Sequence, residues 1–184
     1  MQQKENWTMK IGNTISTFFT AAVLTVSAFG AQIPSTNPNL EKDVRHAINS
    51  LAYYGVFDDL GFTIGDNGVV TLTGEVMQYY VHNSAISAVR DVPGVTRVVD
   101  QIEVLPLSPF DNDIRIRAYN AIFGYPALSR YALNSRPPIH IVVKRGNITL
   151  AGVVNNELDR KLAFTRLRSL PGALSITNDL RLDP

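Results

Sequence analysis

The chain of 184 residues contains no cysteine. Disulfide bonds, thiolate metal sites and cysteine nucleophiles are therefore excluded. The three histidines, His46, His82 and His140, do not show a spacing typical of metal ligands, and no cluster of carboxylates accompanies them. We therefore expect no bound metal and no other cofactor.

Sequence motifs of enzymes are missing as well. The sequence has no G-x-S-x-G nucleophile motif, no P-loop and no G-x-G-x-x-G dinucleotide motif. Carboxylates are present, but nothing in the sequence brings two of them to one cleft. These absences predict a protein that is not an enzyme, with no catalytic residue and no small-molecule substrate.

A long hydrophobic run is also absent. The longest apolar stretch, from Ile15 to Ala28, covers about 14 residues, whereas a membrane-spanning helix needs about 20. Basic residues precede it and a small-x-small tripeptide follows it, which is typical of a cleavable signal peptide over residues 1–31. The alternative is an uncleaved membrane anchor. We expect export to the periplasm or beyond, where a nucleic-acid partner is not expected.

What the sequence does contain is one motif twice. Residues 68–76 read GVVTLTGEV and residues 146–154 read GNITLAGVV, at an offset of 78 that holds to the end of the chain. Pro93-Gly94 falls on Pro171-Gly172 in this register. Two copies of one unit of about 70 residues predict two small domains, each with a core of its own.

The first copy alternates between helical and extended periodicity. Asp66-Asn67-Gly68 predicts a hairpin turn, and Gly74 in the middle of a strand indicates a bulge or a helix that passes close by. The element order α-β-β-α-β predicts a three-stranded sheet with two helices on one face. We expect helices over about 39–51 and 80–92, and strands over 62–64, 69–76 and 95–104.

The second copy repeats this order with one insertion, Gly124 to Pro138, between its first helix and its first strand. The first helix carries a core stripe that includes Ile114 and Ala118, and a second apolar stripe beside Arg115 and Arg117. The second stripe needs a partner, so either the insertion covers it or it is an interaction surface. Its residues are Ile116, Tyr119 and Phe123.

The predicted fold class is α+β, with two tandem two-layer α-β-β-α-β domains. The expected boundaries are a signal peptide over 1–31, a disordered lead-in over 32–38, a first domain over 39–105, a linker over 106–112 and a second domain over 113–184. Residues 32–110 have a formal net charge of −5 and residues 111–184 have +5. Opposite charges on two copies of one fold suggest separate roles or mutual docking.

The repeated pattern resembles the BON domain: G-x-V/I-T-L-x-G-x-V, a helix, P-G and a final strand. The resemblance implies an envelope protein with tandem modules, similar to osmotically inducible periplasmic proteins, and a role in contacting phospholipid. It carries over no catalytic residue, because the matching glycines and threonines are structural positions. They are Gly68, Thr71, Leu72, Gly74, Val76, Pro93, Gly94, Val98 and Asp100, and Gly146, Thr149, Leu150, Gly152, Val154, Pro171, Gly172, Ile176 and Asn178.

The best candidate for a binding site is the second helix of the second copy. Arg160, Phe164 and Arg168 follow one another at i, i+4 and i+8, and Lys161 is adjacent. An aromatic ring among cations on a helix flank is typical of binding to an anionic phospholipid surface. The alternative is that Phe164 packs inside its own domain, as its counterpart Ile86 would.

The leading hypothesis is a non-enzymatic cell-envelope protein that contacts anionic phospholipid and serves envelope maintenance or stress protection, with envelope proteins as further partners. The alternative is a periplasmic protein-binding or chaperone-like factor.

Overall fold

The computed structural model describes residues 37–134 and 138–183. The predicted signal peptide, residues 1–31, lies outside the described residues, as does most of the predicted lead-in, 32–38. These described residues belong to one compact unit. No helix in the described part of the chain is long and apolar enough to span a bilayer.

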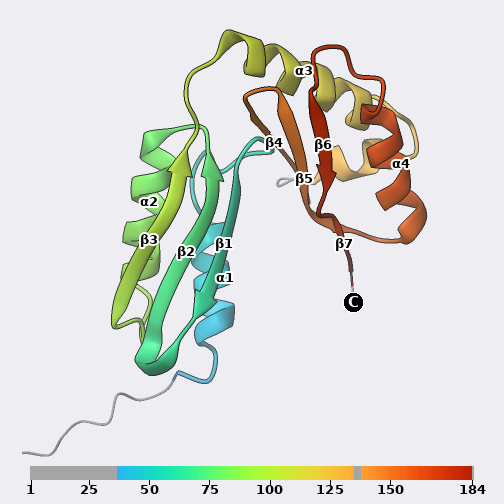
Figure 1. Cartoon of the computed structure of the whole chain (residues 1–184). Coiled ribbons are helices and arrows are strands. Elements are labelled where there is room, and N and C mark those ends of the chain that lie inside the picture. The colour runs from blue at the N-terminus through green and yellow to red at the C-terminus, as the bar shows by residue number, and fades with distance from the viewer. Residues whose placement is uncertain (1–36, 135–137, 184) are drawn as a thin grey trace, which may run out of the picture. The chain divides into compact units, whose positions relative to one another are not determined.

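The first repeat, residues 40–104, is a three-stranded sheet packed against two helices (Figure 1). The central strand, β2, is antiparallel to β1 and parallel to β3, which the chain reaches through α2. This arrangement confirms the predicted α-β-β-α-β unit. Its elements are α1 (Leu40–Asn49), β1 (Asp59–Ile64), the 3-10 turn η1 (Asp66–Gly68), β2 (Val69–Val76), α2 (Tyr79–Arg90) and β3 (Arg97–Val104).

The first core consists of the apolar positions that the periodicity indicates. The two helices contribute every fourth residue to this core, and β2 contributes alternate residues. These side chains pack against one another in a buried layer between the helices and the sheet. The hairpin turn is also as predicted, because Asn67 and Gly68 adopt positive φ angles of 57° and 73°. The most deeply buried members of this core are Val44, Val70, Leu72, Val76, Val81, Ala85 and Val89.

Gly74 sits in the middle of β2 with φ +114°, and a Cβ atom there would lie 2.1 Å from the carbonyl oxygen of Asp59. Gly152, at the same place in the second repeat, has φ +106° and leaves a Cβ only 2.0 Å from the oxygen of Pro138. The element that passes close to this glycine is therefore the adjoining strand. The pairing of β2 with β1 and β3 also runs through Gly74 without a bulge, so both predicted alternatives, a bulge and a nearby helix, were wrong.

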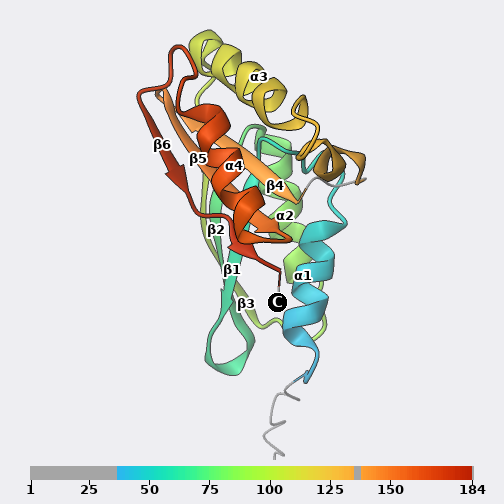
Figure 2. The same ribbon diagram turned by 90° about the vertical axis from the view of Figure 1, so that its right-hand side faces the viewer.

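The second repeat, residues 109–182, has the same plan, with α3 and α4 packed on its sheet (Figure 2). The final strand that the repeated element order predicts is interrupted, so β5 pairs with two short parallel strands instead of one. Asn178 Oδ1 accepts a hydrogen bond of 3.4 Å from the Leu180 N–H, and Leu180 turns into the core. The elements are α3 (Pro109–Phe123), the 3-10 segment η2 (Ser129–Leu133), β4 (Ile139–Lys144), β5 (Asn147–Val154), α4 (Glu157–Leu167), β6 (Ser175–Asn178) and β7 (Arg181–Leu182).

Helix α3 begins earlier than the sequence indicated. Ser108 is its N-cap and accepts a hydrogen bond of 3.2 Å from the Asp111 N–H, while Pro109 occupies the first turn. Residues 109–112, which were predicted to be linker, are therefore helical.

Several side chains from the described part of the insertion in the second repeat belong to the core. Leu128 is fully buried and Tyr131 is 3% exposed, and both pack in one cluster with Phe123 of the second apolar stripe. Tyr119 of that stripe contacts the ring of Phe57 from the first repeat, with centroids 6.2 Å apart. The stripe is thus covered at its C-terminal end, while Ile116 stays half exposed.

Residues of the first repeat contribute to the second core. Val56 and Phe57 pack against it, and the Ile141 N–H donates a hydrogen bond of 2.7 Å to the carbonyl of Val56. Lys144 and Glu103 form an ion pair between the oppositely charged repeats. The two repeats therefore touch through backbone, apolar and charged groups.

Candidate functional site

Helix α4 presents the predicted site residues beside the edge strand β6. Its core side is formed by Ala163 and Leu167, which are fully buried, and by Leu162, which packs partly against the same cluster. The neighbouring flank is left facing solvent over the sheet edge.

A hollow of about 410 Å³ lies on this flank. Three of the four predicted site residues, Arg160, Lys161 and Phe164, line it, together with Thr165 and Asn178. Asn178, at the end of β6, connects α4 to the sheet, because its side-chain amide donates a hydrogen bond of 3.1 Å to the Arg160 carbonyl. The structure therefore combines an aromatic ring, cations and neutral polar groups at one surface.

Arg168 is the fourth predicted site residue and does not line the hollow. It is the C-cap of α4, where its side chain is exposed. It lies two turns beyond Arg160 along the helix, so it extends the cationic flank past the hollow.

Phe164 is half-buried, and the apolar residues that pack against the second core in the described part of the chain do not include it. Its counterpart in the first repeat, Ile86, does pack against the first core. The two positions therefore differ in role as well as in residue type. The geometry favours a ring directed to the hollow over a ring that fills the domain interior.

Glu157 is part of this site and was not among the predicted residues. Its carboxylate accepts hydrogen bonds of 2.7 and 2.8 Å from the Arg160 guanidinium and lies 3.6 Å from Lys161 Nζ. The bonds from Arg160 lower the pKa of Glu157 below its ordinary value. Spacings of i, i+3 and i, i+4 on a helix are the sequence signal that could have found this residue.

The first repeat has no equivalent cationic surface at the same flank. His82 Nε2 lies 2.9 Å from Asp100 Oδ2, so the residue that matches Arg160 is paired with the residue that matches Asn178. Arg90 matches Arg168 and is exposed. The contrast agrees with the charge difference between the repeats.

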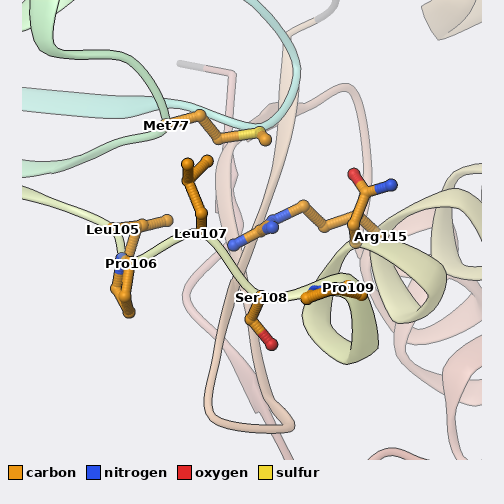
Figure 3. A pocket seen from close by; sticks show the side chains of 8 residues that line it. Met77, Leu105, Pro106, Leu107, Ser108, Pro109 and Arg115 are labelled. Carbon is orange, nitrogen blue, oxygen red and sulfur yellow. The ribbon is translucent and has the colours of Figure 1, made fainter.

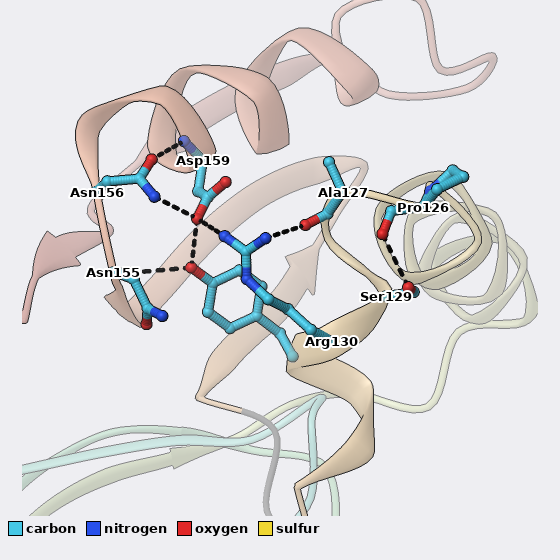
Figure 4. Close-up of polar contacts among 8 residues, drawn as sticks. Pro126, Ala127, Ser129, Arg130, Asn155, Asn156 and Asp159 are labelled. Atoms are coloured by element: carbon cyan, nitrogen blue, oxygen red, sulfur yellow. Dashed lines mark hydrogen bonds and ion pairs between the residues drawn. The ribbon is translucent and has the colours of Figure 1, made fainter.

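A network of polar side chains anchors the N-terminal end of α4 (Figure 4). Asp159 is 3% exposed and accepts hydrogen bonds from Arg130, from the Tyr131 hydroxyl at 2.6 Å and from the Asn156 amide at 3.0 Å. Asn156 in turn caps the helix by accepting the Asp159 N–H at 2.8 Å. The insertion, through Arg130 and Tyr131, therefore holds α4 and the site that it carries.

The histidines lie apart from one another. His46 lies near Ser50, His82 is bonded to Asp100, and His140 Nδ1 lies 3.3 Å from the carbonyl of Gly55. Within residues 37–134 and 138–183, no group of three or more histidines and carboxylates could hold a metal ion.

Comparisons with known proteins place the chain in a family. No curated protein matches it. Two solved structures of CdsD, a structural protein of the type III secretion system of Chlamydia trachomatis, match at 16% sequence identity and a TM-score of 0.30, and one of them is the C-terminal domain. They cover 79% of this chain and 98% and 93% of the matched chains. A model of the BON domain matches residues 63–106 and 127–184, together more than half of the sequence, and this chain belongs to the BON domain family.

Proposed function

We propose that this chain is a non-enzymatic protein of the cell envelope whose second repeat contacts anionic phospholipid. The family suggests a role at membranes and is generally non-enzymatic. The observation that carries the proposal is the hollow on α4, where Phe164 stands among Arg160 and Lys161 instead of packing in the core. In this arrangement the ring enters the headgroup region while the cations meet lipid phosphates.

The test is binding of the protein to vesicles that contain an anionic lipid such as phosphatidylglycerol. Arg160→Ala and Arg168→Ala should each weaken binding about fivefold, which is the usual effect of one cation near an anionic surface. Binding should fall as salt rises and should vanish on neutral phosphatidylcholine vesicles. Phe164→Ala should weaken binding without changing its salt dependence, because the ring contributes apolar burial and not charge.

The matched control is Arg166→Ala, which removes the same charge from the same helix. Arg166 is directed to α3, where Nε lies 3.3 Å from the Ala121 carbonyl and the guanidinium lies 4.8 Å from the ring centroid of Tyr125. Thermal melting of Phe164→Ala must come first. A loss of about 3–5 kcal/mol in the free energy of unfolding would show that the ring is buried in the core. If Arg166→Ala and Arg160→Ala weaken binding equally, the proposed lipid site on α4 is contradicted.

The second prediction concerns Glu157, whose negative charge opposes lipid binding. Glu157→Gln should strengthen binding to the same anionic vesicles about fivefold, because it adds one net positive charge and releases the paired cations. Co-sedimentation at neutral pH measures the effect. Glu41→Gln is the control, since it breaks the pair with Arg45 on α1 of the first repeat. An equal gain in that control would show that net charge alone decides binding.

The pH dependence of this effect has a defined sign. Glu157 has a lowered pKa in the folded chain, so it remains ionised at and somewhat below the ordinary value of 4.5. The stabilising effect of its ion pairs is present above that ordinary value and is lost as the pH falls through the lowered one. The gain from Glu157→Gln should therefore be full at neutral pH and should disappear only in acid, when the carboxyl group of the unmodified chain is protonated.

The alternative function, binding of an envelope protein, is supported by a separate surface on the first repeat. Tyr53 is 79% exposed, Tyr79 is 66% exposed and Tyr80 is 44% exposed. The rings of Tyr53 and Tyr80 form an edge-to-face pair with centroids 5.3 Å apart. Exposed tyrosines of this kind are enriched where proteins bind one another. If the unmodified chain does not bind anionic vesicles, that result would favour this alternative.

A further inference from the structure

A small cavity of about 230 Å³ lies where the chain passes from β3 to α3 (Figure 3). Most of its wall is aliphatic: it is lined by the side chains of Met77, Leu105 and Leu107 and by the rings of Pro106 and Pro109. Leu105 is buried, whereas Leu107 is 88% exposed and stands at the mouth. One charged side chain, Arg115 of α3, also lines the cavity.

Arg115 is 2% exposed, and its guanidinium is not fully paired. Nη2 donates a hydrogen bond of 2.6 Å to the carbonyl of Val143, but Nε is buried and has no hydrogen-bond partner among the described residues. Burial lowers the pKa of Arg115, and the nearby carboxylates Asp111 and Asp58 oppose that shift only in part. A buried charge is costly unless a counter-ion pairs with it, so the cavity that Arg115 lines favours an anion.

The neighbouring carboxylates do not supply that counter-ion. Asp111 accepts two backbone N–H groups, at 2.9 and 2.8 Å, and Asp58 accepts two others, at 2.9 and 2.7 Å. In the described part of the chain neither one forms an ion pair with Arg115. The cavity therefore combines a cation that lacks a direct counter-ion with an aliphatic wall.

We propose that this cavity binds a free fatty acid, with the carboxylate on Arg115 and the start of the aliphatic chain against the leucine and proline side chains. A peptide fits the wall poorly, because Pro106 and Pro109 have no N–H group to donate to a peptide backbone. The volume equals that of about seven or eight water molecules at about 30 Å³ each, which suits a carboxylate with a short length of chain. The rest of the aliphatic chain of the fatty acid lies along the exposed side chain of Leu107. This site is separate from the α4 flank and does not depend on the proposed membrane contact.

The experiment titrates the full chain with decanoate, below its micelle-forming concentration, and follows backbone amide resonances by NMR. We expect saturable shifts concentrated over residues 105–115. Decanol, which has the same chain without the charge, should bind at least tenfold more weakly, as expected when a hydrogen bond to a charged group is lost. Arg115→Met should weaken decanoate binding by a similar factor.

Leu107→Glu keeps the test valid even if the Arg115 variant does not fold, because Leu107 is exposed. It places a carboxylate at the mouth and should abolish decanoate binding. Leu133→Glu, at another leucine that is 85% exposed, should leave binding unchanged. Equal affinity for decanoate and decanol, equal losses in the two leucine variants, or no saturable binding would each overturn the proposal.

Discussion

Replacing Asp159 with alanine is expected to lower the free energy of unfolding by about 3 kcal/mol. The change removes the acceptor of the Tyr131 and Asn156 hydrogen bonds, and it leaves the hydroxyl group of Tyr131, a residue that is 3% exposed, without its acceptor. The pair with Arg130 adds little to this figure, because that side chain is 47% exposed and is screened by solvent. Urea denaturation followed by circular dichroism measures the loss.

A double-mutant cycle separates this network from a general effect on α4. Tyr131→Phe removes the hydroxyl that donates to Asp159 and also the acceptor of the Asn155 N–H. If the two side chains act together, the double variant should lose clearly less stability than the sum of the single losses. Glu157→Ala, two residues away with a side chain that is 41% exposed, should leave the unfolding midpoint nearly unchanged, because partly exposed ion pairs contribute little to stability. A loss in Asp159→Ala that is no larger than in Glu157→Ala would exclude a structural role for the buried carboxylate.

The fold could be predicted because both periodicities are local and strong. Val44 and Ile48 on α1, and Val70 and Leu72 on β2, are buried at the positions that the helical and alternating patterns assign to the core. Duplication made the prediction firmer. The offset of 78 carries β2 onto β5 and β3 onto the strands of residues 175–182, with the same pairing register.

The remaining features depend on contacts between distant residues, which local patterns do not record. The pattern placed Arg115 beside the second apolar stripe without assigning it to the core, yet Arg115 is 2% exposed, which is unusual for arginine. Val56 and Phe57 follow no periodic pattern and join the core of the other repeat. On α4, helical spacing identified Arg160, Lys161 and Phe164, but the proximity of Asn178 comes from the pairing of β6 with β5.

Gly74→Ala is expected to destabilise the first repeat by about 3 kcal/mol or more. Two costs combine at this position. An alanine must hold a φ near +114°, which is unfavourable for any residue with a Cβ atom, and that Cβ would overlap the Asp59 carbonyl oxygen at 2.1 Å. The oxygen belongs to the backbone of β1, so the strand itself would have to move and its pairing with β2 would weaken.

Gly65→Ala is the matched control, because Gly65 lies directly after β1 in the same hairpin. Gly65 has φ −93°, and the nearest atom to an added Cβ, the Val69 oxygen, is 3.7 Å away, which is an ordinary contact. This variant should be neutral or more stable by about 0.4–1 kcal/mol, because alanine restricts the unfolded chain. Gly152→Ala should repeat the Gly74→Ala result in the second repeat, where the obstructing atom is the Pro138 oxygen at 2.0 Å. Thermal and urea unfolding of the three variants measure these effects. If Gly74→Ala and Gly65→Ala unfold alike, the close approach of β1 to β2 is not what requires glycine in the repeated motif.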